Sequence, residues 1–263
     1  MELSFVVDTD TSEPPPGPAP RGLEARLARL QEALRAANVE IDSLTYSIAH
    51  DLRTPLMHID GFAQLLQTSP GAVLDHENRE HLERIIGAAR TMGEQIGALV
   101  EYSRVNSAEL TIDEVELETL LDEALEQVRP WSNGRSIQWQ RSRLPVVRGD
   151  AGLLRQVLVN LVSNAVKYTR TRDPAIIEIG AREAPGNVTV FVRDNGVGFD
   201  LKYAKRLFSP FQRMHSTDAF RGIGMGLAKV RRIVARHGGQ VWAEAEVGHG
   251  ATFYFTLPVD VDP

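Results

Sequence analysis

The chain contains 263 residues, 43% of them hydrophobic and 24% charged, which is ordinary globular composition and enough for one large domain or two small ones. Its 29 Lys and Arg are outnumbered by 35 Asp and Glu, so the net charge is -6 and no overall basic field can hold nucleic acid as a main function. The absence of cysteine excludes disulfides, cysteine-ligated zinc and thiol chemistry, and it fits a reducing compartment.

The amino-terminal segment is not expected to be a secretory signal. Met1–Val7 lacks a positive flank and has only a short apolar run, unlike a secretory signal. Nowhere are 18 consecutive residues apolar, so we expect no membrane span and a cytoplasmic protein. Residues 11–20 hold five prolines, which predicts that residues 1–20 form a disordered, extended tether and that the fold begins after them.

Apolar residues recur in steps of four and three between residues 23 and 48, which is a heptad register. One seam position consists of Leu27, Leu34, Ile41 and Ile48, and the other of Leu23, Leu30, Ala37 and Leu44. The pattern predicts a coiled coil and therefore a homodimer. An amphipathic helix packed on its own domain is the alternative, because core stripes and heptads overlap.

The helical pattern continues through Ser47–Leu66, breaks at Thr68–Gly71 and resumes over roughly Asn78–Val105. We therefore expect residues 21–107 to form a coiled coil and an antiparallel helical hairpin. Two such hairpins would make a dimeric four-helix bundle.

Beyond about Ser107, short strand patterns alternate with helical patterns, which predicts an α/β sandwich over residues 108–263 and an α+β chain overall. The expected strands are Ile137–Gln140, Ile176–Ile179, Val188–Arg193, Gln240–Ala245 and Ala251–Leu257, and the expected helices are Leu117–Val128, Ala151–Tyr168 and Met225–His237. Since the last strands read as neighbouring hairpins, a mixed sheet with helices on one face is favoured over a doubly wound parallel sheet.

The stretch Ser47–Pro55 (SIAHDLRTP) places a histidine next to an acid on a helix. His50 lies off the heptad seam, and Thr54 shares its face at a spacing of four. The Asp51 carboxylate can hold the proton on one ring nitrogen, which leaves the other nitrogen a nucleophile near neutral pH. Taken alone, a solvated surface histidine is the commoner explanation.

Asn160 and Asn164 are one turn apart on a helix whose apolar side is expected to face the sheet. Two amide oxygens on one side can complete the shell of a magnesium ion that also binds phosphate oxygens. Asparagine is a poor helix former, which favours a functional role for both residues. Two exposed or capping asparagines remain an alternative.

Two glycine-containing motifs follow. Asp194 ends a strand and is followed by Gly196 and Gly198, so its carboxylate could accept a hydrogen bond from an exocyclic amine beside a planar base. The second motif, Gly222, Gly224 and Gly226, opens a helix whose free N–H groups favour anions.

The long loop between these motifs is expected to be a lid. Its aromatic residues could fasten it and its basic residues could bind phosphate, although solvated surface is an alternative for each basic residue. They are Phe208 and Phe211, and Lys202, Lys205, Arg206, Arg213 and Arg221.

The order of these motifs resembles that of the two-component sensor histidine kinases, over about Leu23 to Leu257. SIAHDLRTPLMHIDGF is especially similar to the His boxes of phytochrome-like kinases. The hairpin resembles a dimerisation and histidine-phosphotransfer domain, and the remainder resembles the Bergerat-type ATP-binding domain shared with gyrase and MutL ATPases.

The resemblance implies that His50 is the phosphoacceptor, Asp51 its acid/base partner and Thr54 the residue that orients water when a response regulator is dephosphorylated. It further implies ATP and Mg2+ as cofactors and a response regulator receiver domain as partner. The implied nucleotide and magnesium residues are Asn160 and Asn164 (the metal), Lys167, Tyr168, Asp194 (the adenine amine), Gly196, Gly198, Arg213, Gly222, Gly224 and Gly226.

Family members usually carry a longer sensor ahead of the hairpin, whereas only some 20 residues precede it here. We therefore expect the signal to arrive through Met1–Pro20, the coiled coil or a separate sensor protein. Two alternatives remain: a Bergerat-type ATPase without phosphohistidine, and a degenerate dimeric scaffold. The sequence identifies neither the stimulus nor the response regulator.

Overall fold

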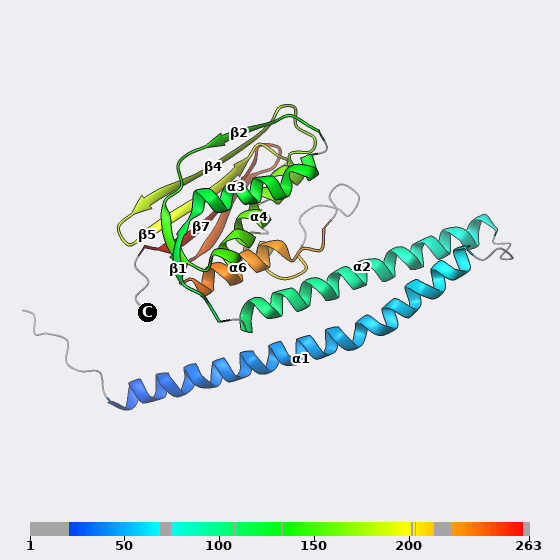
Figure 1. The fold of residues 1–263 in the computed structure, drawn as a ribbon, viewed down its shortest axis with the longest axis horizontal. Helices are drawn as coiled ribbons and strands as arrows, with labels where there is room; N and C mark the ends of the chain where they lie inside the picture. Colours follow the sequence, from blue (N-terminus) through cyan, green and yellow to red (C-terminus); the bar gives the residue numbers. More distant parts are fainter. Residues whose placement is uncertain are drawn as a thin grey trace, which may run out of the picture. The chain divides into compact units, whose positions relative to one another are not determined.

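The computed structural model describes residues 21–68, 75–107, 109–132, 134–200, 202, 204–212 and 222–259 (Figure 1). The described residues divide into two units between Ile41 and Asp42. The predicted tether, residues 1–20, lies outside the described residues. Within the described part of the chain, no helix is both long and apolar enough to cross a membrane.

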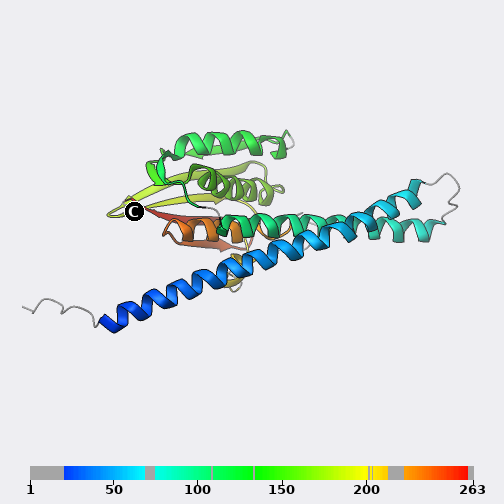
Figure 2. The ribbon, with the colours of Figure 1, turned by 60° about the horizontal axis from the view of Figure 1, so that its bottom comes forward.

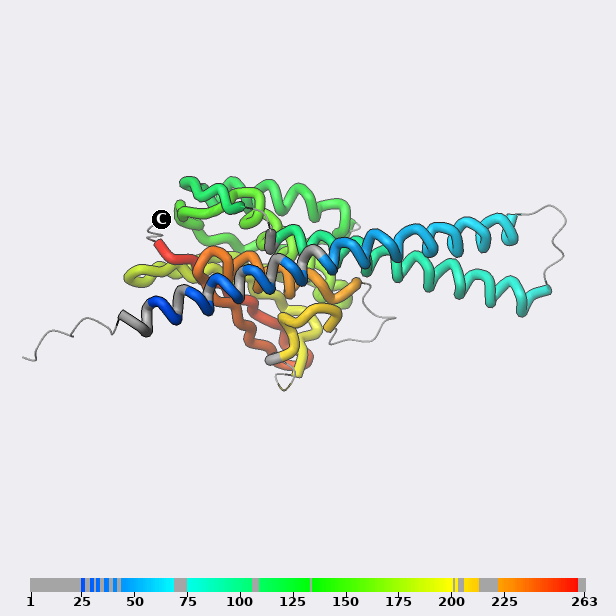
Figure 3. Tube along the Cα trace, turned by 90° about the horizontal axis from the view of Figure 1, so that it is seen from below, coloured from blue at the N-terminus to red at the C-terminus, as the bar shows by residue number. Residues whose placement is uncertain are grey.

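Two long helices come first: α1 is Arg21–Thr68 and α2 is His76–Ser107. Pro55 lies inside α1, which continues through it. From Asp42 onward α1 runs beside α2 as the predicted hairpin (Figure 2 and Figure 3). Two small apolar clusters hold the hairpin together: Ala49, Leu56, Ala89, Ile96 and Val100 in one, and Ala63, Leu82 and Ile86 in the other.

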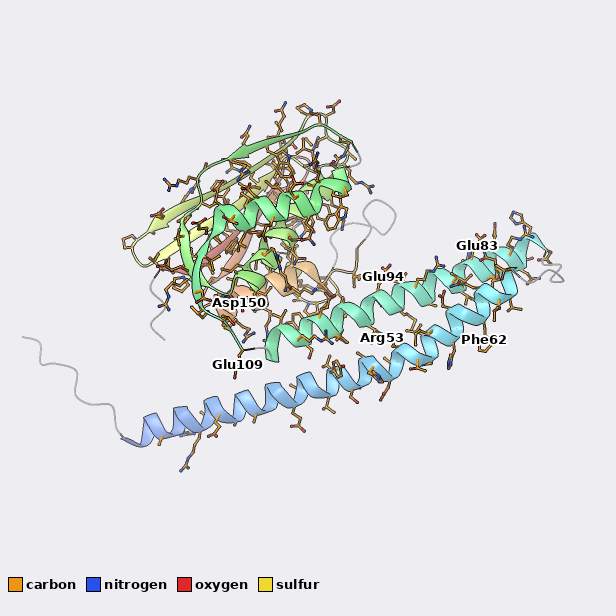
Figure 4. The ribbon with its side chains drawn as sticks, viewed as in Figure 1. Arg53, Phe62, Glu83, Glu94, Glu109 and Asp150 are labelled. Atoms are coloured by element: carbon orange, nitrogen blue, oxygen red, sulfur yellow. The ribbon has the colours of Figure 1, made fainter. Side chains whose placement is uncertain are left out.

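Much of the remaining apolar surface of α1 is uncovered in the single chain. In the hairpin, Leu44, Ile48 and Phe62 are 55%, 57% and 66% exposed, and Figure 4 labels Phe62 on the carboxyl half of α1. In the amino-terminal unit Leu30, Ala37 and Ile41 are exposed, whereas the side chains of Leu23, Leu27 and Leu34 lie outside the described residues. Several large exposed apolar side chains on one helix are typical of an interface.

The second part of the chain is a mixed sheet covered by helices on one face, as predicted (Figure 1). The five strands lie in the order β2 (Ile137–Arg141), β4 (Ala175–Ala184), β5 (Asn187–Asp194), β7 (Gly250–Pro258) and β6 (Val241–Glu246). Only the β2–β4 pair is parallel among these strands. The covering helices are α3 (Leu117–Val128), α4 (Ala151–Tyr168) and α6 (Gly226–Arg236). The fold class is therefore α+β.

Four further elements were not predicted from the sequence. The strands β1 (Asp113–Glu116) and β3 (Val146–Gly149) pair antiparallel as a separate two-stranded sheet. A 3-10 turn, η1 (Arg129–Ser132), follows α3, and a short helix, α5 (Ala204–Leu207), lies in the region predicted to be a lid.

The core lies between the sheet and the helices. On β5, Val188, Val190 and Val192 alternate inward, and Val192 stands opposite Phe253 of β7. Full burial of side chains of this size contributes about 1.5 to 3 kcal/mol each. Since side chains alternate between faces along a strand, Asp194 continues this inward series at the end of β5. The strand thereby delivers a carboxylate to the helix-covered side of the sheet.

Candidate functional site

His50 projects from α1 into solvent. The preceding residue, Ala49, is 1% exposed and packs in the hairpin core, so the next side chain along the helix points elsewhere. The His50 ring is 66% exposed, and its Nδ1 lies 3.3 Å from Oδ1 of Asp51. Thr54, one turn further on, is also exposed. A proton on Nδ1 is thus within reach of a carboxylate, while Nε2 is open to an incoming group.

A cavity of about 600 Å³ lies beside α4 and the start of α6. Its lining includes seven of the residues that the sequence analysis assigned to nucleotide binding: Asn160, Asn164, Lys167, Tyr168, Gly222, Gly224 and Gly226. These positions are far apart in the sequence and come from two motifs. The fold therefore brings the asparagine helix and the glycine-rich segment to one place.

The sequence of α4 explains how its polar side reaches this cavity. Asp150 caps the helix, because its carboxylate accepts a hydrogen bond of 3.0 Å from the Leu153 backbone N–H. The predicted apolar residues are buried in the core: Leu154, Val157, Leu158, Leu161 and Val162. Steps of three and four on the opposite side place Asn160, Asn164 and Lys167 in one row along the cavity.

The asparagine amides offer oxygen ligands. Asn160 donates from Nδ2 to the backbone oxygen of Gln156 at 2.7 Å, which turns its Oδ1 away from that bond. A Cβ on Gly226 would lie 2.8 Å from this Oδ1, so the amide oxygen faces the glycine-rich segment. Hard amide oxygens in a cavity sized for a phosphorylated ligand are a donor set that fits Mg2+ together with phosphate oxygens and water.

Asp194 lies in a smaller apolar pocket that adjoins this cavity. The pocket, of about 30 Å³, shares Tyr168, Leu207 and Leu227 with the larger cavity. Asp194 is 4% exposed, and burial raises the pKa of its carboxyl to about 6 against the opposing effect of backbone N–H groups. One of these, the Gly196 N–H, donates to Oδ1 at 2.8 Å.

Two glycines, one lining each cavity, are required by close backbone approaches. Gly198 has φ of 61°, and a Cβ there would lie 1.9 Å from the backbone oxygen of Glu246. Gly224 has φ of 80°, and a Cβ there would lie 2.6 Å from the backbone oxygen of Gln212. Gly196 does not line either cavity and acts instead through its bond to Asp194.

We expect Gly198→Ala to lower the free energy of unfolding by more than about 2 kcal/mol, because it combines a left-handed conformation with a clash against backbone. Gly186→Ala is the matched control, since Gly186 also has positive φ (78°) but open space around its Cβ position. It should cost only the conformational part, about 1 kcal/mol. Urea unfolding of both variants measures this, and equal losses would contradict the close approach at Gly198.

The start of α6 exposes backbone donors to the cavity. Its N-cap, Met225, makes no side-chain cap hydrogen bond, and both Gly226 and Leu227 line the cavity. Free N–H groups at a helix start favour an anion. A Cβ on Gly222 would lie 2.9 Å from Lys167 Nζ, so a cation also borders this segment.

The basic residues of the predicted lid are described only in part. Arg213 and Arg221 lie outside the described residues, as does the side chain of Lys205. Lys202 and Arg206 are exposed. Phe208 packs against the core, as a fastening role would require, whereas Phe211 is 42% exposed.

Other residues around the cavity were not predicted from the sequence. Trp131, on η1, is half exposed at its edge, and Lys229 of α6 lines it while paired with Glu101 of α2. The remaining lining residues that were missed are Ala98, Ser163, Val166, Arg170, Leu207, Gln212, Ile223, Met225 and Leu227. Leu227 and Lys229 follow the glycines directly and could have been found from that position, whereas nothing in the local pattern marks Trp131.

Two family models match the chain. Residues 40–108 match the His Kinase A (phospho-acceptor) domain, and residues 149–261 match the histidine kinase-, DNA gyrase B- and HSP90-like ATPase. The first match includes His50, Asp51 and Thr54, and the second includes all of the predicted nucleotide-binding positions.

The chain is 34% identical to cyanobacterial phytochrome A of Nostoc sp. (strain PCC 7120) over 89% of its own length and 30% of that protein. It is also 34% identical to the methanogenesis regulatory histidine kinase FilI of Methanothrix harundinacea, over 87% of its own length and 26% of that protein. The chain thus spans less than a third of these relatives. Among solved structures, full-length ShkA in complex with AMPPNP matches 84% of this chain and 47% of its own, with a TM-score of 0.59 and 29% identity.

Proposed function

Because the chain belongs to the sensor histidine kinases, we propose that it phosphorylates itself on His50 with the γ-phosphoryl group of ATP and passes that group to an aspartate of a response regulator. The observation that carries the proposal is the single cavity lined by Asn160, Asn164, Lys167 and the three glycines, in the same chain as an exposed histidine paired with an acid. A response regulator is the partner implied by this activity.

Nucleotide binding is assigned to both adjoining cavities. The Asp194 carboxylate accepts a hydrogen bond from the exocyclic amine of adenine, in the apolar pocket beside Tyr168. The free N–H groups at Gly226 and the start of α6 face the phosphates, with Lys167 adding positive charge. Asn160 and Asn164 would hold Mg2+, which supplies neutralisation of phosphate charge when bound.

Phosphoryl transfer then depends on positioning. The Nε2 lone pair of His50 attacks the γ-phosphorus in line, a P–N bond forms, the bond from phosphorus to the bridging oxygen breaks, and ADP leaves. The proton on Nδ1 is held by Asp51, whose carboxylate lies 3.3 Å away. Transfer onward places the phosphoryl group on a carboxylate of the receiver domain and restores neutral His50.

The experiment that tests the proposal is incubation of the chain with γ-labelled ATP and Mg2+. Label that is lost in acid and kept in alkali indicates phosphohistidine. ATP hydrolysis without protein-bound label would contradict the proposal and favour an ATPase.

Thr54 is proposed to orient the water that dephosphorylates the receiver domain, since it is exposed one turn from His50. We expect Thr54→Ala to slow this dephosphorylation about ten-fold more than it slows labelling of His50, because orientation of water matters only for hydrolysis. Ser47→Ala, which removes another exposed hydroxyl of α1, is the control and should change neither rate. The measurement follows label on a receiver domain that accepts it from the chain; equal slowing of both reactions by Thr54→Ala would contradict the role.

The wider organisation is proposed as well. Residues 21–107 would serve as coiled coil and as dimerisation and phosphotransfer hairpin, residues 108–263 as the ATP-binding domain, and residues 1–20 as a tether. The exposed apolar side chains of α1 support a homodimer. A cytoplasmic location, a separate sensor protein and a balance between kinase and phosphatase activity complete the proposal.

A further inference from the structure

The loop that follows β5, residues 195–198, is held by backbone hydrogen bonds to three different segments. The Asn195 N–H donates to Ile176 and the Val197 N–H donates to Tyr168, both at 3.2 Å, while the Val197 oxygen accepts from the Gly248 N–H at 2.8 Å. Strand β4, the end of α4 and the β6–β7 turn therefore all fix this loop.

Arg172 adds a link that no sequence motif indicated. It lies just after α4, and its Nη2 donates to the backbone oxygen of Gly196 at 3.0 Å and to that of Gly248 at 2.5 Å. Its Nε is buried and has no hydrogen-bond partner among the described residues. One nitrogen atom of this side chain therefore joins the loop after β5 to the β6–β7 turn.

The residue held by this link is also one of the two, with Ala251, whose backbone N–H groups bond to the Asp194 carboxylate. Gly196 accepts from Arg172 through its oxygen and donates from its N–H to Asp194 Oδ1 at 2.8 Å. The same part of the sheet edge also approaches the loop closely at Gly198, where no side chain fits against Glu246. A shift of the β6–β7 turn would therefore move Gly196, and with it one of the backbone donors that orient the buried carboxylate.

We propose that Arg172 is a positioning residue for nucleotide recognition: by joining Gly196 to Gly248, it holds the Asp194 carboxylate where it accepts a hydrogen bond from the adenine amine, and so sets the preference for adenine over guanine nucleotides. Guanine presents a carbonyl oxygen where adenine presents an amine, and an acceptor facing a fixed carboxylate is rejected. This inference rests on the proposed function.

The test compares Arg172→Met with Arg172→Lys in the full chain. In Arg172→Met, the dissociation constant for ATP in calorimetry should rise about ten-fold, which is the effect of losing one or two ordered hydrogen bonds. The constant for GTP should change less, so the ATP/GTP preference falls, while the rate of His50 labelling at saturating ATP stays the same. Arg172→Lys should keep near wild-type values, because one ammonium nitrogen can donate to both carbonyl oxygens.

Arg155→Ala is the matched control, since Arg155 makes an exposed ion pair with Glu123 and should leave both constants unchanged. An unchanged ATP constant in Arg172→Met, or equal weakening for ATP and GTP, or a lower labelling rate at saturating ATP, would overturn the inference. Should Arg172→Met fail to fold, Arg172→Gln, which is too short to reach both oxygens, takes its place with the same expected results. A wild-type chain that neither binds ATP nor acquires label would instead contradict the proposed function.

Discussion

His50→Gln is expected to abolish acid-labile labelling of the chain by γ-labelled ATP while leaving nucleotide binding unchanged. Glutamine keeps a polar side chain of similar reach but has no ring nitrogen with a nucleophilic lone pair. His50 is exposed and belongs to neither apolar cluster of the hairpin, so its replacement removes no core packing. Labelling measures the chemical step, and calorimetry with ATP measures the cavity separately.

His58→Gln provides the control for the position of the label. His58 lies on the same helix, is also exposed and contacts Phe62 rather than an acid. The His58→Gln variant should be labelled to the same extent as the wild type. Label that persists in His50→Gln would contradict the assignment, and label that disappears in both variants would point to a disturbance of α1 rather than to a phosphoacceptor.

Asp194→Asn is expected to weaken ATP binding about 100-fold, near the upper end of what one hydrogen bond to a charged group contributes. The substitution places an NH2 group where one carboxylate oxygen was, so a donor can face the amine of adenine. Glu178→Gln is the control, because Glu178 is a carboxylate on the neighbouring strand that pairs with Arg193 outside both cavities. Wild-type affinity in Asp194→Asn would remove Asp194 from the adenine site.

The same substitution should stabilise the protein without ligand, in a pH-dependent way. Folding raises the pKa of Asp194 from 3.8 to about 6, so the folded state binds the proton more tightly than the unfolded state. Between these values stability therefore falls as pH rises, and above about 6 the penalty reaches about 3 kcal/mol. Asparagine carries no charge to bury, so the variant avoids this penalty.

Urea unfolding at two pH values checks the sign. Near pH 7.5 the variant should exceed the wild type by up to about 3 kcal/mol, and the difference should shrink as pH falls toward 4. A difference that is independent of pH would mean that the effect comes from packing rather than from ionisation. The two Asp194 predictions together describe a residue that destabilises the fold and is needed for the ligand.

The periodic elements were predictable, whereas two of the shortest strands were not. The bounds of α3 and α4 agree with the sequence prediction, because each shows steps of three and four that end in a clear break. By contrast, β1 and β3 have four residues each, and each has one buried side chain, Val115 and Val147 respectively, which is too little for alternation to stand out. Their pairing depends on segments that lie far apart in the sequence.

The same contrast holds at the site. Asn160, Asn164 and Asp194 could be selected because an unfavourable residue type sat at a recognisable place on a helix or strand. Trp131 and Arg172 could not, since a turn between elements carries no periodicity and only the folded chain brings it to the cavity or to the loop of Asp194. Tertiary contacts, rather than local sequence patterns, determine whether such residues belong to the site.

The exposed apolar side chains of α1 affect how much of the protein is active in the proposed dimeric form. In the proposed dimer these side chains leave water only when two chains meet, so the paired hairpin follows mass action. The fraction of chains that are paired then depends on the concentration of the chain as well as on its sequence. Expression level would act as an input in its own right, and a cell that halves the amount of this chain would lose more than half of its phosphorylating units when copies are scarce.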